Sequence, residues 1–144
     1  MSATAGAAEL GPAGRFGLSP GMVVQELGWD DDVDAELRAG IEAVVGSPLV
    51  DDDYGDVVDA VVLWWRGDDG DLVDGLVDAL TDLADGGTIW LLTPKVGRDN
   101  YVDPSDVSEA APTAGLATTT SLAAGSQWVA TKLVSPKAAK SGRR

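Results

Sequence analysis

The central stretch of the chain, residues 59–95, constrains the fold more than any other part. It contains two apolar runs, at residues 60–65 and 88–92, with a longer segment of helical spacing between them. Both runs are too short for helices and are rich in strand formers, and Gly86-Gly87 is expected to stop the helix. Two apolar strands joined by a crossover helix pair in parallel and are covered on both faces. The stretch therefore predicts an α/β fold.

The helix expected between these strands has an apolar face and an acidic face. Its apolar residues at helical spacing are Leu72, Val73, Leu76, Val77, Leu80, Leu83 and Ala84. Its outer face carries Asp71, Asp74, Asp78, Asp82 and Asp85, with no Lys opposite them. Like charges at this spacing cost a few tenths of a kcal/mol per pair. Either the packed face compensates for this repulsion, or a cationic partner covers the acidic stripe.

The residues before this stretch predict a strand, a helix and a second, shorter strand. The first strand covers residues 22–27. The helix is expected to start at Asp30 as its N-cap, because further aspartates follow in its first turn, and to end at Gly46. Its expected buried stripe is Val33, Leu37, Ile41 and Val44. Residues 47–50 read as a short strand near a sheet edge, because the segment contains a proline.

The residues after it predict a helix and a hairpin. Asp103 is the expected N-cap of a helix that has Pro104 in its first turn and runs to about Ala111. Residues 118–123 and 127–134 are two strands that a short turn joins into an antiparallel hairpin. Trp64 and Trp65 point to opposite faces of their strand, so at least one of them is core, and Trp90 and Trp128 are also predicted to be core.

The length and composition are those of one globular domain. The chain has 144 residues, of which 44% are hydrophobic and 24% charged. We expect a disordered N-terminus over residues 1–11, a single α/β domain over residues 12–135, and a basic disordered tail over residues 136–144. The sequence has no stretch that would span a bilayer and no signal-peptide pattern, which predicts a cytoplasmic protein.

The chain contains no His and no Cys. This excludes Ser-His-Asp and Cys-His catalysis, thiol redox chemistry, and zinc sites built from thiolate or imidazole. An enzyme would have to use carboxylates, hydroxyls, Lys95, Tyr54 or Tyr101, and acid–base catalysis near neutral pH is harder without His. The sequence therefore favours a protein that is not an enzyme, with no catalytic residues and no cofactor.

The charge of the chain is strongly negative and unevenly spread. The net charge is −14, and residues 1–94 hold twenty acids and three bases, whereas residues 95–144 hold four acids and seven bases. A negative field repels nucleic acid and anionic membranes. We therefore expect no membrane partner, and nucleic acid only as a weak partner through the tail. The cations of that tail are Lys137, Lys140, Arg143 and Arg144.

A ligand site, if present, is expected beyond the carboxyl ends of the parallel strands. The candidate ligand-binding residues at that rim are Gly28, Trp29, Asp30, Trp65, Arg66, Thr93 and Lys95. Arg66 and Lys95 would form a site for a small anionic ligand, and Trp29 or Trp65 would stack on its ring. The alternative is that Arg66 and Lys95 pair with nearby aspartates at positions 30, 68 or 69, and exposed pairs of this kind contribute little.

Three acidic clusters, at residues 30–32, 51–53 and 68–69, raise the question of a metal site. None of them has the calcium-loop pattern of alternating oxygen ligands, a glycine at the sixth position and a distal Glu. The sequence therefore predicts no metal ligands.

The order of the expected elements resembles a Rossmann-type methyltransferase with its middle removed. Residues 59–63 resemble the fourth strand of that fold, residues 86–91 its fifth, and residues 114–116 the approach to its terminal hairpin. The resemblance implies a reduced Rossmann/methyltransferase-like three-layer sandwich, with a mostly parallel sheet and a C-terminal antiparallel hairpin. The first turn departs from that pattern, because Gly28 is its single glycine and bulky Trp29 follows it.

More closely, the chain resembles a family of short acidic actinobacterial proteins of unknown function. The segments that carry this resemblance are Gly21-Met-Val-Val-Gln-Glu-Leu-Gly-Trp29, Leu63-Trp-Trp65, Ile89-Trp-Leu-Leu-Thr-Pro-Lys95 and Ala111-Pro-Thr-Ala-Gly-Leu116. The resemblance implies one cytoplasmic domain and carries no assigned activity.

Three functions remain open from the sequence. The first is a non-catalytic binding or regulatory module that acts through protein contacts, either at the acidic helix face or at the tryptophan-containing rim. The alternative is a protein that binds a nucleotide or an S-adenosylmethionine-like small molecule, including a methyltransferase, since methyl transfer relies mainly on proximity and orientation. The third is a structural subunit that pairs through an open strand edge.

Overall fold

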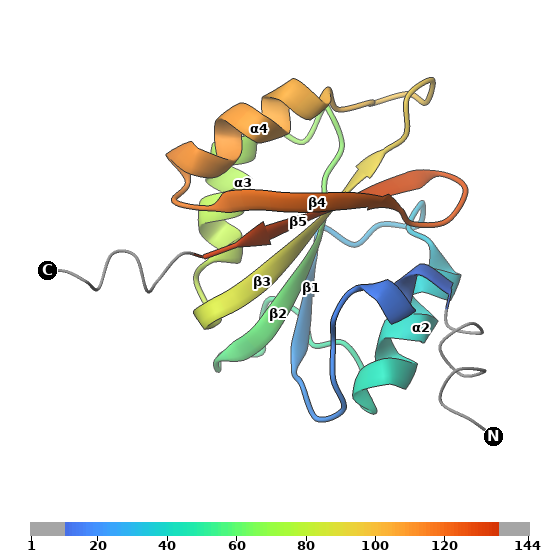
Figure 1. Ribbon diagram of the computed structural model, residues 1–144, viewed down its shortest axis with the longest axis vertical. Coiled ribbons are helices and arrows are strands. Elements are labelled where there is room, and N and C mark those ends of the chain that lie inside the picture. The colour runs from blue at the N-terminus through green and yellow to red at the C-terminus, as the bar shows by residue number, and fades with distance from the viewer. Residues whose placement is uncertain (1–10, 136–144) are drawn as a thin grey trace, which may run out of the picture.

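The computed structural model describes residues 11–135, which form a five-stranded sheet with helices on both faces (Figure 1). The strands are β1 (Val24–Leu27), β2 (Val58–Trp64), β3 (Leu83–Pro94), β4 (Ala117–Ala123) and β5 (Trp128–Val134). The helices are the 3-10 helix η1 (Gly11–Arg15) and the α-helices α2 (Ala35–Val45), α3 (Leu72–Ala79) and α4 (Pro104–Thr113). The expected disordered ends lie outside the described residues, except for Gly11, which begins η1.

The sheet is mostly parallel and ends in the predicted antiparallel hairpin. Its strand order is β1-β2-β3-β5-β4. β1 pairs with β2 and β2 pairs with β3 in parallel, whereas β5 runs antiparallel to both β3 and β4. The carboxyl ends of the three parallel strands therefore meet at one edge of the sheet. This arrangement confirms the fold class expected from the sequence.

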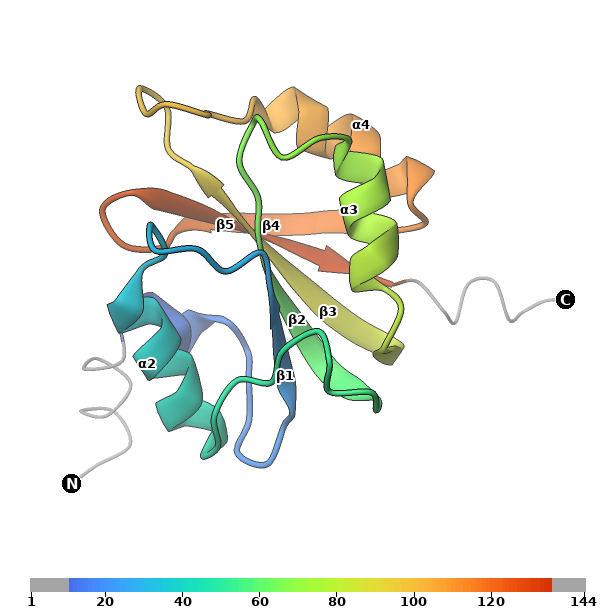
Figure 2. The ribbon, with the colours of Figure 1, turned by 180° about the vertical axis from the view of Figure 1, so that it is seen from behind.

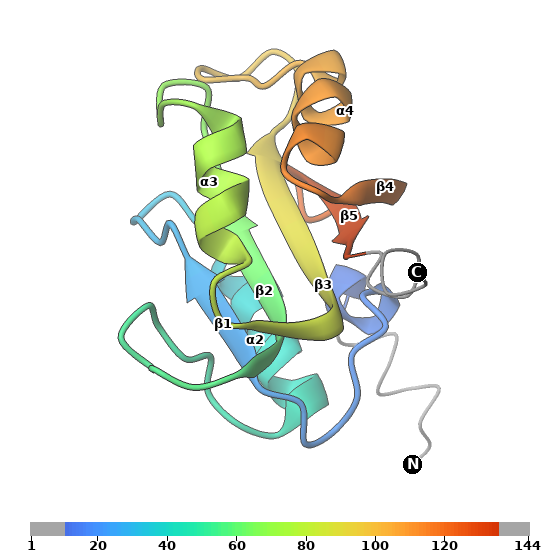
Figure 3. The ribbon, with the colours of Figure 1, turned by 90° about the vertical axis from the view of Figure 1, so that its left-hand side faces the viewer.

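Each face of the sheet has its own apolar core. One core joins η1 and α2 to the sheet and contains Phe16, Ile41, Trp64, Trp90 and Trp128. The other joins α3 and α4 to the opposite face, as Figures 2 and 3 show. The two cores make the three layers of the sandwich.

Aromatic contacts fix the first of these cores. Phe16 stacks on Trp90 with ring centroids 4.1 Å apart, and Trp64 meets Trp128 edge to face at 4.9 Å. The Trp90 Nε1 donates to the Phe16 carbonyl at 3.0 Å, which satisfies the indole. Trp90 and Trp128 are fully buried, as predicted, and only Trp64 of the adjacent pair lies in this core. Pairs of this geometry stabilise a core beyond the area that they bury.

The start of α2 differs from the prediction. Asp34, not Asp30, is the N-cap, and its Oδ1 accepts a hydrogen bond from the Leu37 amide at 2.8 Å. Residues 30–33 form a turn instead, because Asp32 is held by a contact to another strand end, described below. Leu37 and Ile41 are buried as expected, although Val45 rather than Val44 is the fully buried valine. The helix ends at Gly46, as predicted.

The end of α3 also differs from the prediction. The helix stops at Ala79, and Leu83 already begins β3, so Gly86-Gly87 lies inside a strand. Backbone pairing competes with the helix here, because Val58 of β2 donates to the Asp82 carbonyl at 2.8 Å and pairs with Leu83. The prediction of one acidic face along a single helix is therefore wrong. Of its residues, Asp74 and Asp78 lie within α3, Asp71 is its N-cap, and Asp82 and Asp85 lie beyond its end.

The short strand expected at residues 47–50 is reduced to a single bridge. Val50 pairs in parallel with Gln25, and two backbone hydrogen bonds of 2.7 and 2.9 Å join Val50 to β1. Because β1 is the outermost strand, this contact lies at the edge of the sheet. At the other end of the chain, α4 begins after Asp103 as predicted and continues through Pro112 to Thr113.

Candidate ligand-binding cleft

A cleft of about 640 Å³ opens beyond the carboxyl ends of β1 and β2 and continues along α3. Five of the seven predicted site residues line it, namely Gly28, Trp29, Asp30, Trp65 and Arg66. The other two, Thr93 and Lys95, do not line it. Thr93 is buried in β3 opposite Val129, and the Lys95 amide donates to the Gln127 carbonyl at 3.0 Å.

Gly28 sets the turn that leads out of β1. Its φ is +79°, a left-handed conformation that L side chains rarely adopt. A Cβ atom at this position would lie 2.3 Å from the Trp64 carbonyl oxygen. The glycine is therefore required both by the turn and by the close approach of the turn to the end of β2.

Arg66 follows β2 and is held by the protein itself. Its side chain is 10% exposed. The guanidinium donates to both carboxylate oxygens of Asp32 and, through Nη1, to the Gly28 carbonyl at 2.7 Å. The Asp69 carboxylate lies 3.7 Å away. Pairing with Asp69 was one of the alternatives predicted from the sequence, whereas pairing with Asp32 was missed.

These contacts change the titration of both partners. Burial lowers the pKa of the Arg66 guanidinium, but the hydrogen bonds and charge of Asp32 more than offset burial and leave the pKa above its usual value. The hydrogen bonds from Arg66 also lower the pKa of the Asp32 carboxyl below its usual range. Both groups are therefore charged at neutral pH, and they form a fixed ion pair between two turns.

Trp128 extends this contact into the core. The Trp128 Nε1 donates to the Asp32 carbonyl at 3.3 Å, and the guanidinium carbons of Arg66 and Arg98 each lie 5.4 Å from its ring centroid. This distance is within the range of a cation–π interaction. The ion pair is thus anchored on β5 as well as on the turns after β1 and β2. No single segment of the sequence signals an arrangement that joins residues 32, 66 and 128.

Two tryptophans form the walls of the cleft. Trp29 is 56% exposed, lines the cleft and belongs to neither apolar core. The Trp65 ring lies against Gly75 of α3, where a Cβ atom would come within 2.4 Å of the ring. Leu27 and Leu63 contribute the apolar part of the lining. An open, aromatic-walled space of this volume is within the usual range for a ligand site.

The charge of the cleft is negative. Its lining contains the carboxylates of Asp30, Asp52, Asp69, Asp78 and Asp82, and Arg66 is its one cation among the described residues. The cleft also reaches the C-terminal end of α3, where the helix dipole is negative and the last turn contains no basic residue. Arg66 is neutralised by Asp32, so the remaining field favours a cation.

One buried polar side chain also lines the cleft. Gln25 is 3% exposed, and its Nε2 donates to the Asp51 carbonyl at 3.1 Å. No donor within residues 11–135 forms a hydrogen bond with its Oε1. Buried polar atoms are normally paired, so this oxygen is an exception among the residues that line the cleft.

Three neighbouring carboxylates, which the sequence did not predict to be metal ligands, lie close together in the connector before β2. Carboxylate oxygens of Asp51, Asp52 and Asp53 lie within 4.8 Å of one another, and all three residues are exposed. The Asp53 amide donates to the Asp51 carboxylate at 3.0 Å, which accounts for the turn. Exposed acidic groups commonly lie this close without an ion, so the cluster gives no further support for a metal.

None of the helices within residues 11–135 has the length and hydropathy needed to cross a membrane.

Relatives in sequence have no described function. The family described as "Protein of unknown function (DUF3052)" matches residues 13–137. Uncharacterised proteins of Mycobacterium bovis and Mycobacterium tuberculosis are each 48% identical to this chain over 132 residues, which cover 92% of this chain and 82% of each relative. These matches agree with the resemblance to an actinobacterial family without an assigned activity.

Relatives in structure are methyltransferases and a biosynthetic protein. The pyocyanin biosynthetic protein PhzM superposes with a TM-score of 0.66 at 12% identity, covering 88% of this chain and 54% of that chain. The mitomycin 7-O-methyltransferase MmcR gives 0.64 at 12% identity, covering 92% and 54%. The magnesium protoporphyrin IX methyltransferase of Synechocystis PCC 6803 gives 0.56 at 9% identity, covering 92% and 78%.

These superpositions establish the fold and no more. The chain spans about half the length of the first two proteins. At such low identity the likeness shows a Rossmann-like, methyltransferase-type fold, as predicted, and one fold supports many functions.

Proposed function

Since the chain belongs to the DUF3052 family of proteins of unknown function, we propose that it is a non-catalytic binding module that acts through contacts with another protein. The partner places a basic side chain, from Lys or Arg, in the cleft between α3 and the carboxyl end of β1. The observation that carries this proposal is the charge of the cleft. Five carboxylates line it, and the one cation of its lining within residues 11–135 is already paired with Asp32.

The walls of the cleft suit the same ligand. A Lys or Arg group is attracted to the face of a tryptophan ring, and Trp29 is exposed while Trp65 is held in place on α3. The apolar stem of a basic side chain would contact Leu27 and Leu63, and its head would reach the carboxylates. The unpaired Oε1 of Gln25 offers one more acceptor, and basic side chains only donate.

The structure weakens the case for a small anionic ligand. Arg66 was one of the two cations expected to bind it, and three of the Arg66 donors are engaged by Asp32 and the Gly28 carbonyl. Lys95, the other cation, is not part of the cleft lining. An anion would therefore meet five carboxylates, and no unpaired cation from residues 11–135 lines the cleft to offset them.

A second candidate is an S-adenosylmethionine-like ligand. The observation that favours it is the position of the cleft, beyond the carboxyl ends of parallel strands in a fold shared with methyltransferases. The sulfonium group of such a ligand is a cation, and Trp29 would stack on its adenine. The same acidic, aromatic lining would accept both ligands, so the experiment has to separate them.

The test is a binding titration at low salt with fluorescein-labelled hexa-arginine, followed by fluorescence anisotropy. Replacing both Asp78 and Asp82 by Asn should weaken binding roughly fivefold, because two ion pairs of about 0.5 kcal/mol each are lost. The matched control replaces Asp74 and Asp85 by Asn, which changes the net charge equally at exposed positions outside the cleft. The control should retain nearly the original affinity.

Each outcome of this titration decides between the candidates. Equal weakening in both double variants would show that the peptide binds the general negative field, and would refute the cleft as its site. S-adenosylmethionine is titrated separately by calorimetry. If it binds and the peptide does not, the second candidate replaces the first.

A further inference from the structure

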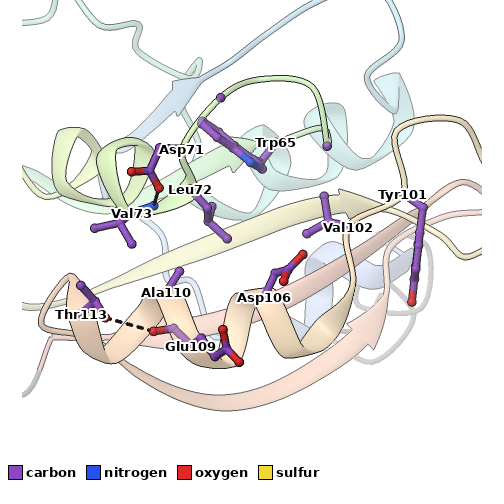
Figure 4. Close-up of a pocket in the computed structure, with 12 residues that line it drawn as sticks. Trp65, Asp71, Leu72, Val73, Tyr101, Val102, Asp106, Glu109, Ala110 and Thr113 are labelled. Carbon is purple, nitrogen blue, oxygen red and sulfur yellow. Dashed lines mark hydrogen bonds between the residues drawn. The ribbon is translucent and has the colours of Figure 1, made fainter.

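A second cleft, of about 490 Å³, lies between the N-terminal half of α3 and one side of α4, on the same face of the sheet as the first (Figure 4). Trp65 lines both clefts and separates them. The second cleft has no residue in common with the sequence-predicted site except Trp65. It is therefore a separate space with its own chemistry.

The floor of this cleft is apolar and its walls are aromatic. Val102 and Ala110 are buried, and Leu72 and Val73 are half-buried beside them. Trp65 and Tyr101 stand on two sides of this floor, as Figure 4 shows, and Tyr101 is 39% exposed. An apolar ligand body would replace water on these surfaces, which is favourable.

The entrance to the cleft is held by backbone contacts. The Gly67 amide donates to the Asn100 carbonyl at 2.8 Å, which joins the turn after β2 to the loop before α4. A Cβ atom on Gly67 would lie 3.0 Å from the Tyr101 carbonyl, so the two segments are in close contact. The Trp65 ring is fixed against Gly75 in the same way. The cleft is therefore formed before any ligand binds.

Carboxylates from both helices surround the cleft. Asp71 caps α3 and accepts a hydrogen bond from the Val73 amide at 3.1 Å. Asp106 and Glu109 lie one turn apart on α4, and no cation or hydrogen-bond donor within residues 11–135 pairs with either carboxylate. The N-terminal end of each helix contributes only about half a positive charge. Three full negative charges outweigh these dipoles, so the cleft repels anions.

We propose that this cleft binds a small organic ammonium ion with an aromatic or aliphatic body. The body lies on Val102 and Ala110 between the two aromatic rings, and the ammonium group donates to Asp106 and Glu109. An ammonium group has three donors and no acceptor, which matches carboxylates that have no protein partner. Charge-assisted hydrogen bonds of this kind are shorter and stronger than neutral ones. The proposal does not depend on the function proposed for the first cleft.

The test uses the full-length protein and three probes that share a phenyl ring and a short chain. These are phenethylamine, 2-phenylethanol and 3-phenylpropionate, which are cationic, neutral and anionic. Each is titrated into ¹⁵N-labelled protein. We expect phenethylamine to shift amide signals of residues 65–73 and 101–113 at concentrations at least tenfold lower than the other two probes require. Equal binding of all three, or shifts spread over the surface, would overturn the proposal.

Two variants locate the site. Replacing Asp106 by Asn together with Glu109 by Gln removes both charges at exposed positions and should weaken phenethylamine binding about tenfold, while the Asp78 and Asp82 double variant should not affect it. Replacing Ala110 by Leu fills the floor and should abolish binding of the amine. If the Leu variant does not fold, the charge variant still decides the matter. Unchanged affinity in the charge variant would refute the ammonium site even if the first cleft binds its peptide.

Discussion

Replacing Arg66 by Met is the sharpest test of how the rim of the sheet is built. If Arg66 is a free ligand-binding cation, this change should abolish binding of an anion and leave stability unchanged. If it is the structural centre described above, the free energy of unfolding should fall. The variant loses the hydrogen bonds to Asp32 and to the Gly28 carbonyl, and it also loses the cation over the Trp128 ring.

The magnitude follows from the burial of the two partners. Breaking a buried ion pair usually costs about 3–5 kcal/mol, because the remaining charge is left without a partner. The Asp32 side chain is 38% exposed and can regain water, which reduces the penalty. Methionine keeps part of the packing against Trp128. We therefore expect a loss of roughly 2–3 kcal/mol.

The assay is urea denaturation followed by tryptophan fluorescence, with thermal melting as a second measurement. For a chain of this size the expected loss corresponds to a melting temperature lower by roughly 5–10 °C. The control is Lys95→Met, which removes the other predicted rim cation. No ion pair joins Lys95 to a carboxylate within residues 11–135, so its replacement should cost less than about 0.5 kcal/mol. Equal, small effects of the two changes would refute the structural role of Arg66.

Three further predictions concern neighbouring residues. Gly28→Ala should destabilise the protein by about 2–4 kcal/mol in urea denaturation, because the added methyl group would lie 2.3 Å from the Trp64 carbonyl oxygen. The control Gly46→Ala, also at positive φ but in open space, should cost about 1 kcal/mol. Equal losses in the two variants would contradict the close approach at Gly28. The pKa of Asp32 is lowered on folding, so its contribution is present above the usual Asp value of about 4 and is lost as pH falls below it. The stability difference between the natural protein and Asp32→Asn should therefore narrow between pH 7 and pH 3, and a constant difference would show that Asp32 does not titrate with folding. Glu26→Gln should cost about 1–3 kcal/mol at neutral pH, because the Glu26 side chain is 8% exposed and Arg38 donates to both of its oxygens at 2.6 and 2.8 Å; an unchanged urea midpoint would argue against this ion pair.

Much of the fold could be predicted because apolar runs and turn-forming glycines determine the secondary structure of short stretches of the chain. The strand at residues 58–64 and the hairpin follow from their apolar and β-branched residues and from the turn between them. The end of α3 could not be predicted in this way. Residues 80–84 fit the helical spacing of α3 equally well, and pairing with Val58 decides in favour of the strand.

The sequence brought several residues of the cleft together but did not predict their contacts. The rule that ligands bind beyond strand carboxyl ends grouped Trp29, Trp65 and Arg66, and these three residues line one cleft. The partner of Arg66 could not be found, because Asp32 lies 34 residues away and is one of several equivalent aspartates. The field is negative because five carboxylates line the cleft, and the contact with Asp32 neutralises the cation that would partly offset them.

The single bridge at Val50 leaves β1 with an open strand edge. β1 is an outer strand, and Val50 pairs with it through only two backbone hydrogen bonds. Three exposed aspartates at residues 51–53 follow at once, so a second molecule that approaches this edge meets a concentrated negative charge. Charged side chains beside an open strand edge are one way in which proteins avoid edge-to-edge aggregation. The acidic connector therefore disfavours the pairing of two molecules edge to edge at β1.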